Sequence, residues 1–169
     1  MACYSWRNDG NRGKEMNKRE LGDEGEHFVA DYLSQRHYAT EIHPRTFKVL
    51  HLPGGKTIIV SNDNDYHNSF DVKAEGPYHM IYAQVKMMPS GVVSSGNISK
   101  AMKKIDRDYP YDFPYQRIQV WMVWKEWVKK PHRHKEFRYR VWERHMVADS
   151  FVWEEINWNE LILTEVANE

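Results

Sequence analysis

Apolar residues recur every three to four positions near the start of the chain, which predicts an amphipathic helix over residues 18–35. Its apolar side comprises Leu21, Gly25, Phe28, Val29, Tyr32 and Leu33. At about 100° per residue, Glu26 lies about 20° from Leu33, at the margin of this side. A carboxylate there loses hydration unless a cation or a hydrogen-bond donor meets it, although its side chain could instead extend to solvent.

Alternation and β-branched residues predict strands through much of the remaining chain. Short strands are expected at residues 39–42 and on both sides of the turn Pro53-Gly54-Gly55. Residues 117–129 are dense in Val, Ile and Trp with little alternation in their first half, which indicates a strand covered on both faces. Residues 136–147 alternate apolar residues with arginines, and the acidic segment 151–166 is expected to close the core as a short strand or helix.

Two further strands, joined by the turn Gly76-Pro77, carry the most informative polar side chains. The apolar positions of the first strand are Phe70, Val72 and Ala74. Asp71 lies on this strand, and on the second strand Gln84 and Lys86 point to one face while Val85 points to the other. If the strands pair, an acid, an amide and an amine converge where the sheet frays. Such a group is suited to holding a divalent cation beside a phosphodiester.

A second helix is predicted after a loop at residues 89–96, with Asn97 or Ser99 as its cap and its end near Asp108. Its expected outward side carries Lys100, Lys103, Lys104 and Arg107. Such lysines commonly form a solvated face, but here they directly follow the candidate polar group.

Charge is balanced overall but unevenly distributed. The 24 Lys and Arg residues equal the 24 Asp and Glu residues, so the net charge favours no class of partner. Residues 125–140 hold seven Lys and Arg against two Glu, whereas residues 141–169 hold one Arg against seven acids. This segregation fits a basic face for a phosphate backbone, and it fits a solvated hairpin with an acidic tail equally well. His132 and His134 could share a metal, but a basic turn is the simpler interpretation.

Cysteine content and hydropathy indicate a cytoplasmic protein. Cys3 is the only cysteine, which excludes an internal disulfide and a cysteine-rich zinc cluster. Neither a membrane-spanning apolar run nor the apolar core of a signal peptide is apparent. Residues 1–18 are polar and without periodicity, so we expect a flexible N-terminal arm, followed by a single domain over residues 19–169.

Taken together, these motifs resemble the PD-(D/E)XK nuclease superfamily. The first helix contains the motif Gly-x-x-Gly-Glu, whose last residue is Glu26. Strands and Asp71 follow it, and thirteen positions after Asp71 come Gln84-Val85-Lys86 and then a second helix. The resemblance covers roughly residues 20–108 and is closest to Holliday-junction-resolvase-like and Mrr-type restriction endonuclease members. Phe70 stands where many members have proline, and Gln84 replaces the usual acid, as in Mrr-type sequences.

The resemblance implies an α/β (α+β) fold with a restriction-endonuclease-like core. Its central mixed β-sheet would be flanked by helices in the order αβββαβ, with extra C-terminal strands. The resemblance also implies a metal-dependent endonuclease that hydrolyses DNA phosphodiester bonds, either structure-selective (junction or flap) or restriction-type. Residues 19–169 would form the single nuclease-like domain.

The implied site consists of Glu26, Asp71, Gln84 and Lys86. Glu26 and Asp71 would hold Mg²⁺ or Mn²⁺ together with the Gln84 side chain and the backbone carbonyl of Val85. Lys86 would orient the attacking water and offset charge on the phosphate. Because Gln84 removes one negative charge, the alternative is a non-catalytic nucleic-acid-binding or assembly module that retains a degenerate fold.

DNA is the expected partner, and the contacts would come from two basic surfaces. The first comprises Lys100, Lys103, Lys104 and Arg107, and the second comprises Arg133, Lys135, Arg138 and Arg140. Contacts of such residues with phosphates bind without reading sequence. Symmetric cutting of two strands would favour a twofold homodimer.

Overall fold

The computed structural model describes residues 18–43, 46–51, 53–62, 66–67, 69–92, 94–129 and 131–157. The expected arm, except for Lys18, and the last part of the expected closing segment lie outside these ranges. Within them, no helix is long and apolar enough to cross a membrane.

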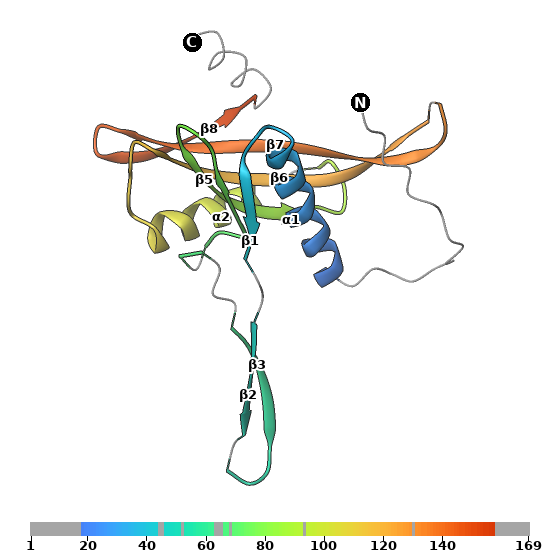
Figure 1. Ribbon diagram of the computed structural model, residues 1–169, viewed down its shortest axis with the longest axis vertical. Helices are drawn as coiled ribbons and strands as arrows, with labels where there is room; N and C mark the ends of the chain where they lie inside the picture. Colours follow the sequence, from blue (N-terminus) through green and yellow to red (C-terminus); the bar gives the residue numbers. More distant parts are fainter. Residues whose placement is uncertain are drawn as a thin grey trace.

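Two helices and eight strands follow one another along the described chain (Figure 1). Their bounds are α1 Lys18–Ser34, β1 Ala39–Ile42, β2 Thr46–His51, β3 Thr57–Asn62, β4 Val72–Glu75, β5 Met80–Met87, α2 Ser95–Asp108, β6 Gln116–Val128, β7 His134–Val147 and β8 Ser150–Ile156. The predicted helices and strands are therefore present, and the described start of the closing segment is a strand.

Six strands form one mixed sheet in the order β1-β4-β5-β6-β7-β8. Neighbouring strands are antiparallel except β5 and β6, which run parallel. A parallel pair needs a crossover connection, and α2 provides it. The α+β class and the mixed sheet with two helices agree with the prediction.

Strands β2 and β3 form a separate two-stranded sheet. In the turn between them, Gly54 and Gly55 have φ values of 91° and 77°, which glycine adopts without a steric penalty. Figure 1 shows this hairpin projecting away from the six-stranded sheet. The predicted hairpin around Pro53-Gly54-Gly55 is confirmed.

Each helix covers one face of the sheet. On the α1 side the buried cluster comprises Val29, Ala30, Leu33, Val72, Ala74, Ile81, Ala83, Val85, Trp121, Val123 and Val141. On the α2 side it comprises Phe70, Tyr82, Met88, Ala101, Ile105, Tyr109, Ile118, Val120, Met122 and Trp142. Because β6 lies between both clusters, residues 118–123 are all buried, as its lack of alternation predicts.

Three expectations from the sequence are wrong in detail, among them that Asp71 lies on the first strand of the pair. Phe70 does not share a face with Val72 and Ala74, because it packs in the α2-side cluster while they pack in the α1-side cluster. Strand β4 begins only at Val72, and the chain bends at Asp71. The second helix starts at Ser95 with Ser94 as its N-cap, earlier than the expected caps Asn97 and Ser99.

Candidate active site

Asp71 lies where β4 and β5 diverge. The last paired residues of the two strands are Val72 and Ala83, whereas β5 continues to Met87. The Asp71 backbone nitrogen donates to the Ala83 carbonyl at 2.9 Å. Its carboxylate Oδ2 accepts the Val85 backbone N–H at 2.7 Å. The carboxylate therefore satisfies a backbone donor that a longer β4 would have satisfied.

The Gln84 side chain binds the same carboxylate oxygen. Gln84 is 2% exposed, and its amide nitrogen Nε2 donates to Asp71 Oδ2. An ionised carboxylate only accepts hydrogen bonds, so the amide nitrogen has to face it. Asp71 Oδ2 thus receives N–H groups from two consecutive residues, Gln84 and Val85. The structure brings together these three predicted site residues.

The Val85 carbonyl faces the same gap. In a strand, the N–H and C=O of one residue point toward the same neighbour. Because the Val85 N–H points to Asp71, its carbonyl also points to the side where β4 has ended. Among the described residues, no strand pairs with this edge of β5 beyond Ala83. A carboxylate and a backbone carbonyl therefore face one space, and both are oxygen donors that Mg²⁺ accepts.

Glu26 approaches from α1, on the other side of Val85. A Cβ atom added to Gly25 would lie 3.4 Å from Val85 Cγ1 and 3.5 Å from Met87 Cβ, so α1 passes close to β5 at this glycine. Glu26, the next residue, is only 7% exposed. The alternative that its carboxylate extends to solvent is therefore wrong, and a buried acid lies one helix residue from the contact with Val85.

Lys86 lies at a pocket on the α2 side of the sheet. Lys86 is exposed, and the pocket has a volume of about 390 Å³. Its walls are formed by Gln84, Lys86, Met87, Met88, Asn97, Lys100, Ala101 and Lys104. Three lysines from two elements therefore share one concave surface with the buried amide of Gln84.

The four predicted basic residues of α2 separate into two pairs. Lys100 and Lys104 line the pocket, whereas Lys103 and Arg107 do not. The Arg107 Nε contacts Asp108 Oδ1 at 2.6 Å, and this guanidinium lowers the pKa of the Asp108 carboxyl. The structure therefore brings Lys100 and Lys104 to the candidate site and leaves Lys103 and Arg107 outside it.

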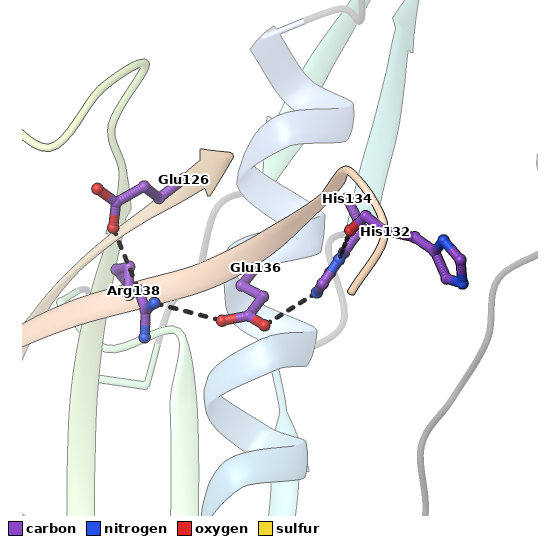
Figure 2. A network of polar contacts seen from close by, with 5 residues as sticks. All are labelled: Glu126, His132, His134, Glu136 and Arg138. Atoms are coloured by element: carbon purple, nitrogen blue, oxygen red, sulfur yellow. Dashed lines mark hydrogen bonds and ion pairs between the residues drawn. The ribbon is translucent and has the colours of Figure 1, made fainter. Parts of the chain in front are cut away.

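The second predicted basic surface is partly neutralised. Arg138 contacts Glu126 at 3.2 Å and Glu136 at 3.3 Å (Figure 2). Arg140 contacts Glu155 of β8 at 2.5 Å. Both arginines form ion pairs with carboxylates of the protein, so the expectation that they form a basic surface with Arg133 and Lys135 is wrong.

His134 belongs to the same group of polar contacts. Its Nδ1 lies 2.6 Å from the His132 carbonyl oxygen, and its Nε2 lies 2.9 Å from Glu136 Oε1. Both neighbours only accept, so the doubly protonated ring satisfies both contacts. The His132 carbonyl and then Glu136 raise the pKa of His134 above its usual value. The shared-metal alternative for the two histidines therefore has no support from this geometry.

A metal ion at any of these places would need neutral oxygen ligands. Within the described ranges, no group of three or more His, Cys, Asp or Glu side chains is arranged to hold a metal ion. Around Asp71, the described oxygen donors are its own carboxylate, the Val85 carbonyl and the Gln84 amide, whereas Glu26 is buried on the neighbouring helix α1.

The sequence did not reveal two long-range contacts near the end of α2. Buried Ser69 donates to Asp108 Oδ2 at 3.3 Å and so ties the end of α2 to the segment entering Asp71. Buried Arg144 donates to the carbonyls of Tyr109 at 2.8 Å and Tyr111 at 2.5 Å. Both contacts join residues more than 30 positions apart, so no local pattern could have indicated them.

No protein-family model matches the chain, and a search of curated proteins gives no match. The resemblance to PD-(D/E)XK nucleases therefore stays a prediction from the sequence motif.

Proposed function

We propose that the protein is a metal-dependent endonuclease that hydrolyses DNA phosphodiester bonds with a PD-(D/E)XK-type site. The observation that carries this proposal is Asp71, which lies at the divergence of β4 and β5 and accepts hydrogen bonds from Gln84 and Val85. Lys86, the next residue but one after Gln84, faces a pocket with two further lysines.

The order of elements supports a restriction-endonuclease-like core. Helix α1 precedes the antiparallel strands β1, β4 and β5, and α2 then leads to β6, which is parallel to β5. This is the αβββαβ order, with β2 and β3 as an insertion and β7 and β8 as additional strands. The proposed site lies at the end of the β4–β5 pair, between the two helices.

The oxygen donors fit a hard divalent cation. Asp71, the Val85 carbonyl and the Gln84 amide would hold Mg²⁺ or Mn²⁺, with Glu26 supplying a second carboxylate from α1. Such an ion supplies positive charge that stabilises the phosphate in the transition state and promotes ionisation of the attacking water. Both effects lower the barrier to phosphodiester hydrolysis.

The three pocket lysines have separate roles. Lys86 is closest in the chain to the metal-binding residues, so it orients the attacking water and offsets the charge that develops on the scissile phosphate. Lys100 and Lys104 line the α2 side of the pocket and bind neighbouring phosphates of the backbone. Contacts to phosphates do not depend on the base sequence, so they agree with an enzyme that selects DNA by its structure.

Gln84 stabilises the site in the absence of a metal ion. Its amide donates to Asp71, so this carboxylate has a partner before any ion arrives. Relative to a glutamate, the site has one negative charge fewer, which weakens its metal affinity and favours a single ion.

A second candidate function is a nucleic-acid-binding module without catalysis. The same Gln84–Asp71 hydrogen bond favours it, because it satisfies one oxygen of the central carboxylate without any metal. In that case the lysine pocket would still bind phosphates.

A cleavage assay separates these candidates. Linear, flapped and four-way DNA are incubated with the protein in Mg²⁺ and in EDTA. We expect cleavage only in Mg²⁺ and its loss in Asp71→Ala and Lys86→Ala, while Lys103→Ala, on α2 but outside the pocket, retains activity. Binding of these DNAs without cleavage of any of them in Mg²⁺ would contradict the nuclease and favour the binding module.

A further inference from the structure

Strands β6 and β7 continue past the sheet as a two-stranded ribbon. The pairing of β6 with β5 ends at Val123, and the pairing of β7 with β8 begins only at Val141. Among the described strands, residues 124–128 of β6 and 134–138 of β7 therefore pair only with each other. Figure 1 shows this hairpin reaching beyond the rest of the sheet.

The base of the ribbon is fixed to α1. Phe28 stacks on Phe137 with ring centroids 4.6 Å apart, and Lys125 Nζ contacts Glu24 Oε2 at 2.7 Å. These contacts anchor the base of the ribbon to the fold, so that the tip is presented in a defined direction.

One face of the tip carries an exposed aromatic ring with two cations. Trp127 is 53% exposed and lies opposite Lys135 in the strand register. The Arg133 guanidinium is 4.5 Å and the Lys135 ammonium 5.1 Å from the centre of its ring. Neither Arg133 nor Lys135 contacts a carboxylate of a described residue. The cation–π contacts thus gather on one apolar surface two positive charges that no described carboxylate contacts.

On the opposite face of the ribbon, acidic and basic side chains pair with one another. Glu126 and Glu136 face each other across the two strands, and Arg138 bridges them, with His134 on the far side of Glu136 (Figure 2). Two acids and two basic groups thus satisfy one another. The positive potential of the tip is therefore concentrated on the Trp127 face.

We propose that the tip of this ribbon is an anchor that binds duplex DNA in a groove, away from the cleaved bond. A two-stranded ribbon fits the major groove, which is about 12 Å wide. Arg133 and Lys135, which both lie near the Trp127 ring, would contact neighbouring backbone phosphates along one edge of the groove, and Trp127 would pack against the adjoining groove wall. The identity of the partner rests on the proposed nuclease function, whereas the geometry of the tip does not.

The strand register sets the reach of the anchor. Gln84 is paired with Val120, and Val128 lies eight residues further along β6. Eight residues at about 3.3 Å each span about 26 Å. Since each strand of duplex DNA carries one phosphate per about 3.4 Å, the tip reaches about eight base pairs from the candidate site. The tip reaches DNA on only one side of the candidate site, because the ribbon extends in one direction.

Equilibrium binding of duplex DNA in EDTA tests this anchor without cleavage. We expect Arg133→Gln combined with Lys135→Gln to lower the affinity on the order of tenfold and to reduce the salt slope by about 1.8, since each phosphate contact contributes about 0.9. Trp127→Ala lowers the affinity as well. Tyr78→Ala removes a more exposed aromatic ring (72% exposed) from the β4–β5 turn and serves as the control without effect. Arg133→Lys with Lys135→Arg retains the charges and the affinity.

The length of the DNA gives an independent readout. On duplexes that extend less than about eight base pairs from the cleaved bond, parent and ribbon variants should bind equally. Unchanged affinity of the ribbon variants on long duplexes would overturn the proposal, as would an equal loss on single-stranded DNA. If the ribbon variants bind weakly but Asp71→Ala cleaves like the parent, the proposed catalytic site fails and the anchor stands.

Discussion

Replacing Gln84 by glutamate tests the candidate site, because it exchanges only the amide NH₂ group for a carboxylate oxygen. In the parent, the Gln84 amide donates to Asp71 Oδ2, and the side chain is 2% exposed. Gln84→Glu would place two carboxylates in contact in a buried position. Without a metal ion they repel each other, whereas a divalent cation would bind both.

The expected destabilisation in EDTA is about 4 kcal/mol at pH 7. Two like charges about 4 Å apart repel by about 4 kcal/mol at an effective dielectric constant of 20. The cost has an upper limit, because the introduced carboxyl can take up a proton and donate a hydrogen bond as the amide does. Protonating a group with an ordinary pKa of about 4.3 at pH 7 costs about 3.7 kcal/mol, so both estimates agree. Since this pKa is raised in the folded state, the loss grows as pH rises above about 4 and is small below it.

Urea denaturation in EDTA and in Mg²⁺ measures both effects. Gln84→Glu should be less stable than the parent in EDTA and should gain more stability from Mg²⁺, by about 2.7 kcal/mol at 100 times the dissociation constant. Gln119→Glu is the matched control, because buried Gln119 Nε2 donates to buried Glu143 Oε2 at 2.6 Å outside the candidate site. It should lose comparable stability without recovery in Mg²⁺. Equal stability of Gln84→Glu and parent in EDTA, or equal gains from Mg²⁺ in both variants, would refute the reasoning.

Three further predictions concern the surroundings of the site and the ribbon. Gly25→Leu should lower the free energy of unfolding by about 1–3 kcal/mol in urea denaturation, because the larger side chain overpacks against Val85. Gly25→Ala should fold normally, since its Cβ makes ordinary contact at 3.4 Å; equal stability of both variants would argue against a close α1–β5 crossing. Arg144→Leu should cost about 3 kcal/mol in the same assay, because two loop carbonyls lose their buried charged donor; a loss under about 1 kcal/mol would contradict that role. In an NMR titration, His134 should show a pKa above about 6.5, and Glu136→Gln should lower it. The contact between His134 and Glu136 stabilises the folded state fully at pH values below the ordinary histidine pKa, and this stabilisation is lost as the pH rises through the raised pKa. A His134 pKa that Glu136→Gln leaves unchanged would contradict the contact.

The sequence predicted those parts of the fold that depend on local patterns. The apolar spacing of α1 placed Glu26 at the margin of its buried face, and the structure buries it there. The two-residue spacing of Gln84 and Lys86 correctly predicted that both face one side of β5. Periodicity was sufficient in these cases because each side-chain direction follows from its own element.

The sequence could not predict contacts that depend on strand register or on a break in a strand. Phe70 changes sides because the chain bends at Asp71, and a pattern of alternation has no means of showing this bend. Arg138 and Arg140 looked like a basic surface, but pairing of β7 with its two neighbours places carboxylates against both. The direct bond of Gln84 to Asp71 likewise depends on how far β4 extends along β5.

The rate of DNA cleavage by Asp71→Asn tests the central claim most directly. Asparagine keeps the size of the side chain but removes the charge that the proposed metal ion needs. With a flapped duplex in Mg²⁺, the account predicts that the parent cleaves, that EDTA stops it, and that Asp71→Asn is slower by roughly a hundredfold or more. Cleavage by Asp71→Asn at the rate of the parent would contradict it.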